Sequence, residues 1–211
     1  MMKKARTAII QRKTKEVQIR GKLNLDGMGK SSITTGIRFL DHMLELFAKH
    51  GLFDLKLNAK GDLDVDIHHT NEDLGLALGD AFLRALGNKE GIRRMGKAYV
   101  PMDESLARVV VDMSGRPYFR WDWSSDRTED SYRRGGSRYR TQLFYDLDDA
   151  KHWLESFVAK SEITLHVDVF KSGEDIHHLL ESVFKALGRA LREAVDLDSR
   201  VRGVPSTKGK L

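Results

Sequence analysis

The sequence predicts an α/β (α+β) fold that is internally duplicated. Each half should form a mostly antiparallel or mixed sheet with helices packed on one face. Two observations predict the duplication. First, Asp66-Ile67-His68-His69 recurs as Asp175-Ile176-His177-His178, and an upstream histidine, His42 or His152, precedes each copy by a nearly equal length of chain. Second, alternating and helical apolar patterns follow one another in the same order in both halves.

The first half, residues 1–92, has the order strand, strand, helix, further strands and helix. Apolar residues alternate where half-buried strands are expected and recur at helical spacing where amphipathic helices are expected. Gly87 is expected to end the last helix. The patterns fall on strand residues 17–25, helix residues 38–49, strand residues 53–57 and 63–67, and helix residues 74–86.

The second half, residues 93–211, repeats this order after a boundary near residues 88–95, which are rich in glycine and charge, and the two halves should work as one functional unit. Its expected elements are strands 107–113 and 117–123, a helix from 153, a strand 163–169 and a helix 180–191. Residues 124–140 form a polar insertion with almost no apolar content. We interpret them as a long surface loop, with a role in substrate contact or assembly as the alternative.

Composition narrows the classes of function. The net charge of +5 is spread along the chain and interleaved with acids, so we expect no nucleic-acid partner. No apolar run reaches membrane-spanning length and no secretory signal is evident, which predicts a cytoplasmic protein without a membrane contact. Cysteine is absent, so thiolate metal sites and a cysteine nucleophile are excluded.

The repeated histidines indicate two metal sites. His68 and Glu72 are four residues apart and share a helix face, as do His177 and Glu181. Adjacent helical residues are about 100° apart, so the two histidines of a pair should serve different ions. With the upstream histidines, the sequence predicts eight ligands, three imidazoles and one carboxylate per ion: His42, His68, His69, Glu72, His152, His177, His178 and Glu181.

A sulfur-free set of imidazoles and carboxylates suits Mn²⁺, Fe²⁺, Co²⁺ or Zn²⁺, and ligand type alone does not choose among them. Room for six-coordination would favour Mn²⁺ over tetrahedral Zn²⁺. His50 is a candidate substrate contact, or it simply closes the helix that it ends.

Along nearly its whole length the chain resembles the imidazoleglycerol-phosphate dehydratase family. The resemblance rests on short blocks that occur in the family's order, among them Asp41-His42-Met43-Leu44 and His68-His69-Thr70-Asn71-Glu72-Asp73. The other matching blocks are residues 14–16, 25–27, 35–40, 50–55, 85–87, 101–104, 114–118, 164–166, 177–181, 184–186 and 205–209.

The resemblance implies a hydro-lyase of histidine biosynthesis. Such an enzyme removes water from imidazoleglycerol phosphate, a small phosphorylated imidazole substrate, to give imidazole acetol phosphate. It also implies two Mn²⁺ ions per active site, bound by the eight ligands named above. The sites would lie between subunits of a large homo-oligomer, a 24-mer in the family. Substrate contacts, mostly to phosphate, would come from Arg94, Arg116, Lys185, Ser206, Thr207 and Lys208.

Catalytic proton transfer is the least constrained part of the prediction. Glu16 stands at the family's substrate-contacting glutamate and is our candidate acid or base, with a metal-activated hydroxide as the rival base. Two departures from the family pattern are the longer segment between Arg116 and His152 and Asp175 before the second histidine pair. The alternative functions are a dinuclear metal phosphoester hydrolase and a non-catalytic metal-dependent assembly protein.

Overall fold

A computed structural model describes residues 5–125 and 145–211, so most of the polar insertion at residues 124–140 lies outside the described residues. The elements are β1 (Thr7–Lys13), β2 (Gln18–Asn24), β3 (Ser31–Thr34), α1 (Arg38–Gly51), β4 (Asp54–Lys60), α2 (His68–Leu86), β5 (Met95–Met102), β6 (Ser105–Asp112), β7 (Tyr118–Trp123), α3 (Leu147–Ser161), β8 (Thr164–Lys171) and α4 (Ile176–Val195). No helix within these residues has the length and hydrophobicity needed to cross a membrane.

The two halves have the same topology, which confirms the predicted duplication. The first sheet has the strand order β1-β2-β4-β3 and the second has the order β5-β6-β8-β7. In each sheet one pair is parallel, β3 with β4 and β7 with β8, and the other pairs are antiparallel. Each half therefore consists of three strands, a helix, a fourth strand and a last helix around a mixed sheet.

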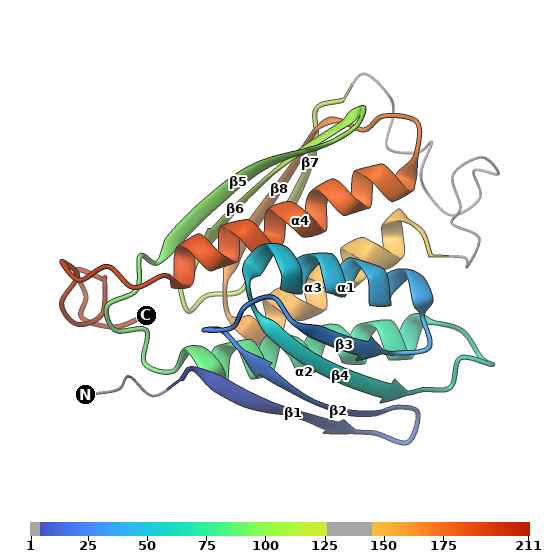
Figure 1. Ribbon diagram of the computed structural model, residues 1–211, viewed down its shortest axis with the longest axis horizontal. Coiled ribbons are helices and arrows are strands. Elements are labelled where there is room, and N and C mark those ends of the chain that lie inside the picture. The colour runs from blue at the N-terminus through green and yellow to red at the C-terminus, as the bar shows by residue number, and fades with distance from the viewer. Residues whose placement is uncertain (1–4, 126–144) are drawn as a thin grey trace.

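Helices α1, α2, α3 and α4 lie between the two sheets, as Figure 1 shows. Helices α1 and α2 cover one face of the first sheet, and α3 and α4 cover one face of the second. Alternate residues of the central strands, such as Leu55 and Leu57 in β4 and Leu165 and Val167 in β8, are buried against these helices. Covering each sheet on one face confirms the predicted layering and leaves the opposite faces uncovered by helices.

Helices from the two halves cross so closely at two points that their backbones are nearly in contact. A Cβ on Gly188 of α4 would lie 2.5 Å from the carbonyl oxygen of Phe47 in α1, and a Cβ on Gly75 of α2 would lie 2.7 Å from the carbonyl oxygen of Trp153 in α3. No larger side chain fits at either crossing without moving a helix. Each first-half helix is thus packed closely against one helix of the second half.

Three strands, β1, β3 and β5, were not predicted from the apolar pattern. β1 carries an exposed apolar residue, Ile9, on its outer face, which breaks the alternation. β3 has only four residues and buries only Ile33. β5 turns Met95 and Tyr99 outward and buries small residues, so hydrophobicity there does not mark the inner face.

The strand predicted at residues 63–67 is wrong. That segment is a turn in which the Val65 N–H donates to the Asp62 carbonyl at 2.8 Å, and Val65 is 69% exposed. Polar residues alternate with the apolar ones there, and their local hydrogen bonds stabilise a turn in preference to a ladder. The helix end predicted at Gly87 is confirmed: this residue caps α2 with a φ of 69°.

The Gly188 crossing gives a first prediction. Gly188→Ala should lower the free energy of unfolding by about 1–3 kcal/mol, because its Cβ overlaps the backbone of α1. Urea denaturation measures the change. Arg189→Ala, at the exposed neighbouring position on α4, is the matched control and should change it by no more than about 0.5 kcal/mol. Equal urea midpoints for the two variants would contradict the packing argument.

Candidate functional site

The two histidine pairs lie at the N-terminal ends of α2 and α4, each held by the aspartate that precedes it. Asp66 accepts a hydrogen bond from the His68 N–H at 2.7 Å, and Asp175 accepts one from the His177 N–H at 2.8 Å. Asp175 is the N-cap of α4, whereas Asp66 precedes the N-cap residue Ile67 and holds the first residue of α2. The rings within a pair diverge, with interplanar angles of 80° for the first pair and 83° for the second. Each pair therefore presents its two imidazoles in different directions.

One cluster joins α1 to α4. The Nε2 atoms of His42 and His177 lie 2.8 and 2.9 Å from the same carboxylate oxygen, Oε1 of Glu181. Burial alone would raise the pKa of Glu181, but hydrogen bonds from Lys185, His42 and His177 together lower that pKa to about 2. The cluster is thus an ionised, buried carboxylate with two imidazoles around it, and their ligand atoms lie within 4.8 Å of one another.

A second cluster joins α2 to α3 and mirrors the first. The ring centroids of His68 and His152 are 4.4 Å apart, and Oε2 of Glu72 lies 4.0 Å from Nε2 of His68. These ligand atoms also lie within 4.8 Å of one another. In both clusters a histidine and a glutamate come from one half of the chain and the remaining histidine from the other half. Each cluster offers two nitrogens and one oxygen, a donor set that could hold a divalent transition metal.

The remaining two predicted ligands lie outside both clusters. His69 Nδ1 lies 3.0 Å from Oδ2 of Asp62, and this hydrogen bond is the largest cause that raises the pKa of His69. His178 Nδ1 lies 3.0 Å from Oε2 of Glu104. In protein metal sites an imidazole commonly donates one ring N–H to a carboxylate and binds the ion through the other nitrogen. Both histidines make the carboxylate contact of that arrangement, each through its Nδ1 atom.

Sequence reasoning did not single out the acids beside these histidines. Asp103 and Glu104 form the tight turn between β5 and β6 and group with His178 as a third potential ligand set, and Asp62 lies in the turn before α2. Asp103 has a positive φ of 46°, which marks a constrained turn. The only sequence signal was the block at residues 101–104, and it does not say which histidine these acids face.

Glu16 is held near His69 by a hydrogen-bond network. It lies in the turn between β1 and β2, where Thr14 Oγ1 accepts the Glu16 N–H at 3.2 Å. Asp73, one turn after His69 on α2, accepts hydrogen bonds from Thr14 Oγ1 at 3.3 Å and from Arg12 Nε at 2.6 Å. The charge of Glu16 also contributes to the raised pKa of His69, after the effects of Asp62. The turn that carries Glu16 is therefore anchored to the helix that carries the histidine pair.

Lys185 and His50 lie close to the first cluster. Lys185 donates to Oε2 of Glu181, one helical turn earlier on α4, and contacts the sulfur of Met102 at 3.2 Å. His50 is near the end of α1, and its pKa is lowered by burial and then by the positive charges of Lys185 and Arg189. These two predicted substrate contacts thus share one side of the α1–α4 pair with Glu181.

The other predicted substrate contacts lie at the opposite end of the molecule. Arg94 forms an ion pair with Asp112 at 2.7 Å and donates to the Pro205 carbonyl at 2.9 Å, next to Ser206, Thr207 and Lys208 in the C-terminal tail. Its N–H donates to the Ala194 carbonyl, near the last residue of α4. Gly115, beside Arg116, faces the terminal Leu211. Figure 1 shows the tail at the far end of α4 from the start of that helix.

Within one chain, the histidine–glutamate clusters and the basic residues around Arg94 cannot contact the same small substrate. His177 and Ala194 are at opposite ends of α4, and at 1.5 Å per residue they are roughly 25 Å apart. The structure therefore assembles two metal-type clusters at one end and a basic group of Arg94, Arg116, Ser206, Thr207 and Lys208 at the other.

Comparisons with known proteins show the family of the chain. The family described as imidazoleglycerol-phosphate dehydratase matches residues 35–191. A protein of that name from Thermoanaerobacter pseudethanolicus is 50% identical over 206 residues, which are 98% of this chain and 100% of the relative. One from Marinobacter nauticus is 48% identical over 207 residues, 98% of each chain.

Solved structures match as well. Imidazoleglycerol-phosphate dehydratase from Staphylococcus aureus superposes with a TM-score of 0.74 at 34% identity and covers 91% of this chain and 99% of its own. The enzyme from Pyrococcus furiosus, solved in complex with (S)-C348, superposes with a TM-score of 0.74 at 33% identity and covers 95% of this chain and 99% of its own.

Proposed function

The chain belongs to the imidazoleglycerol-phosphate dehydratase family and has its dehydratase function in histidine biosynthesis, and we propose how its own residues perform the reaction. The reaction, that of a hydro-lyase, removes a hydroxyl group and a carbon-bound proton from imidazoleglycerol phosphate and yields imidazole acetol phosphate. The observation that carries the proposal is the pair of mirrored clusters, each with two imidazoles and one carboxylate.

We assign one Mn²⁺ ion to each cluster. The departing proton is not next to a carbonyl group, so the substrate's imidazole ring must take up negative charge. Two bound Mn²⁺ ions, one near each ring nitrogen, would supply Lewis-acid stabilisation of that charge. The donor set fits, because it combines nitrogen and oxygen ligands without sulfur and leaves positions for further ligands. His42, His177 and Glu181 would hold one ion, and His68, Glu72 and His152 the other.

Each cluster has two imidazoles where three are expected. This supports a site that is completed by a second copy of the chain. His69 and His178 point to Asp62 and Glu104 and belong to neither cluster. Each would supply the third nitrogen to an ion held by a neighbouring copy. This arrangement also explains how Arg94 and the C-terminal tail, far from the clusters within one chain, could reach a substrate bound at the clusters of another.

The outer face of the second sheet supports self-association. Met95, Tyr99 and Tyr118 on this face are 58%, 55% and 52% exposed. Arg108 stacks over the rings of Tyr99 and Phe170 and pairs with Asp168. Aromatic residues, methionine and arginine are enriched at protein interfaces. We propose a homo-oligomer with sites between subunits, the 24-mer of the family. A cytoplasmic location stays a prediction.

The basic residues would hold the substrate's phosphate. Arg94, Arg116 and Lys208 provide positive charge, and the Ser206 and Thr207 hydroxyls can donate hydrogen bonds to its oxygens. Lys185 and His50, beside the first cluster, would contact the substrate at the metal end. Glu16, held beside His69 by Thr14, would move a proton between substrate and solvent.

The function is tested by removing and restoring the metal. Protein stripped with a chelator should not form imidazole acetol phosphate from imidazoleglycerol phosphate, and added Mn²⁺ should restore turnover, because the clusters lack the Lewis acid without it. Product formation measured before and after Mn²⁺ addition gives the answer. Full activity of the stripped protein would refute the metal assignment. Phosphate release without dehydration would indicate a phosphoester hydrolase instead.

The role of Glu16 is tested by Glu16→Gln, which keeps the shape of the side chain and removes its basicity. We expect kcat to fall by about 10²–10⁴-fold, the usual contribution of a general acid or base, with Mn²⁺ still bound. Lys15→Gln, the exposed neighbour in the same turn, is the matched control and should keep wild-type turnover. If Glu16→Gln turned over at the wild-type rate with its metal bound, the base would have to be another group.

Completion of a site by a second copy is tested by mixing two inactive variants. His177→Gln removes a cluster ligand and Arg94→Gln removes an anion contact at the other end of α4. Suppose that one site combines the His177 end of one copy with the Arg94 end of another. Variants co-assembled in equal amounts should then regain roughly a quarter of wild-type activity, since that fraction of sites combines two intact contributions. Activity is assayed after the two proteins are dissociated and reassembled together. Mixtures as inactive as the separate variants would place each site within one chain.

A further inference from the structure

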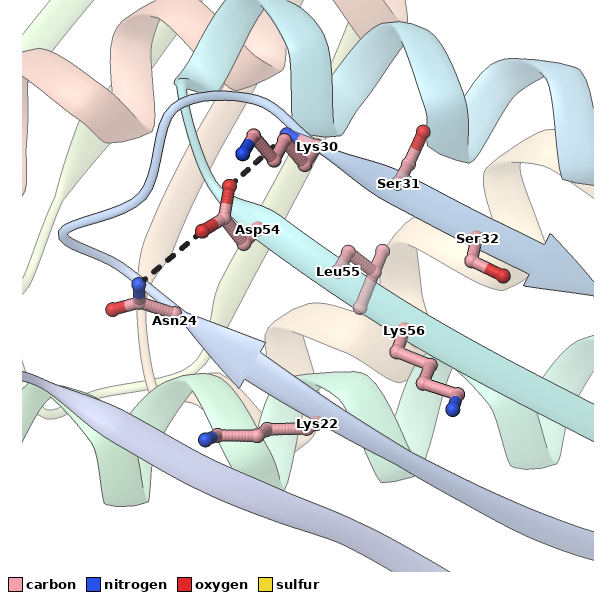
Figure 2. A pocket seen from close by; sticks show the side chains of 8 residues that line it. All are labelled: Lys22, Asn24, Lys30, Ser31, Ser32, Asp54, Leu55 and Lys56. Carbon is pink, nitrogen blue, oxygen red and sulfur yellow. Dashed lines mark hydrogen bonds between the residues drawn. The ribbon is translucent and has the colours of Figure 1, made fainter.

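A pocket on the outer face of the first sheet lies apart from every residue assigned above. It encloses about 380 Å³, within the roughly 300–1,000 Å³ of small-molecule sites. Figure 2 shows it crossing three neighbouring strands, β2, β4 and β3. The residues that line it are Lys22, Asn24, Lys30, Ser31, Ser32, Asp54, Leu55 and Lys56. Helices α1 and α2, which carry His42 and His68, cover the other face of this sheet.

Two of its lysines are placed unfavourably for the sheet itself. Lys22 and Lys56 are directly opposite each other in the β2–β4 register, and Ser32 is opposite Lys56 on the β3 side. Like charges directly opposite each other destabilise a sheet. Among the residues that the structure describes, neither lysine forms an ion pair with a carboxylate. A bound anion would relieve this repulsion.

The one carboxylate in the pocket is already engaged by the backbone. Asp54 Oδ1 accepts the N–H groups of Met28 and Lys30 at 2.9 and 3.0 Å, and Asn24 donates to Oδ2 at 3.5 Å. Figure 2 marks the bonds to Lys30 and Asn24. The backbone hydrogen bonds are also the main reason why the pKa of Asp54 is lowered. Asp54 therefore fixes the connection before β3, and Lys30 is the pocket lysine whose charge acts on it.

The duplicated half shows that the fold does not require these lysines. β4 begins at Asp54 and β8 begins at Thr164, so Lys56 and His166 occupy the same third position of their strands. Their partners in the adjacent strand are Lys22 and Val110. The same backbone framework thus carries a histidine and a valine in the second sheet, and the lysine pair is a property of the first sheet alone.

We propose that this pocket binds a phosphate-type anion, either inorganic phosphate or the phosphoryl group of an organic ester. Lys22, Lys30 and Lys56 supply positive charge, a common means of binding phosphate groups. The Ser32 hydroxyl, on the same sheet face as Lys56, supplies a hydrogen-bond donor from the adjoining strand. The site is open to solvent, so binding weakens as ionic strength rises. The inference does not depend on the proposed mechanism, because no residue of the pocket belongs to it.

The test is calorimetric titration of the Mn²⁺-loaded protein, at low ionic strength, with inorganic phosphate and separately with methyl phosphate. The double variant Lys22→Gln/Lys56→Gln should weaken binding at this site by at least about tenfold, a change of roughly 1.4 kcal/mol. Lys13→Gln/Lys60→Gln is the matched control: both lysines are exposed on strands of the same sheet, outside the pocket, and the charge change is the same. It should keep wild-type affinity.

Each outcome has a defined meaning. Anion binding at the catalytic site would persist in Lys22→Gln/Lys56→Gln, so the wild type should show one more site than this variant, and dehydratase turnover should be unchanged. Binding of inorganic phosphate alone would identify the free ion as the ligand, and binding of methyl phosphate as well would extend it to esters. Unchanged affinity in Lys22→Gln/Lys56→Gln, or an equal loss in the control, would overturn the proposal.

A second variant guards against a folding artefact. Removing the opposed charges should leave the urea midpoint of Lys22→Gln/Lys56→Gln equal to or above that of the wild type. If that midpoint falls, Ser32→Ala, which removes one donor and no charge, should still weaken phosphate binding measurably. Wild-type affinity in Ser32→Ala together with a destabilised lysine variant would refute the site.

Discussion

The close crossing of helices from different halves is the constraint on which the rest of the molecule depends. Gly188 lets α4 contact the backbone of α1, and Gly75 lets α2 contact the backbone of α3. Because both crossings join the two halves, each helix that carries a histidine–glutamate pair meets the other half's single upstream histidine. Neither half by itself can form either of the two histidine–glutamate clusters. Loss of either crossing would separate ligands while leaving both sheets intact.

The length of α4 divides the chemistry between the two ends of the chain. Its first two turns carry His177 and Glu181, and its last turn is joined to Arg94, which holds the C-terminal tail through the Pro205 carbonyl. A rigid helix keeps these groups apart, and for this reason we propose that a substrate contacting both lies between copies. Under this proposal, assembly and catalysis would depend on the same interface. An Mn²⁺ ion bound by residues of two copies would stabilise the assembly and complete the active site.

The two outer sheet faces show how a duplicated framework can take on separate tasks. The backbone register of β2 with β4 repeats in β6 with β8, yet one face carries Lys22 and Lys56 and the other carries exposed aromatic residues such as Tyr99 and Tyr118. Inner faces must preserve packing against the helices, so they vary little in character. Outer faces have no such restriction, and charge on one and aromatic surface on the other suit an anion and a second copy of the chain.

The sequence by itself determined the duplication, the amphipathic helices and the residue types of the candidate ligands, because these depend on local periodicity and on a repeated motif. It did not reveal β1, β3 and β5, whose inner faces carry too few large apolar residues to form a pattern, and it mistook a turn at residues 63–67 for a strand. Only the tertiary structure decided which ligands meet. His42 and Glu181 are 139 positions apart, and His69 and His178 turn to acids that no spacing rule connects to them. Such pairings are set by helix crossings and turn geometry, which depend on packing between distant segments.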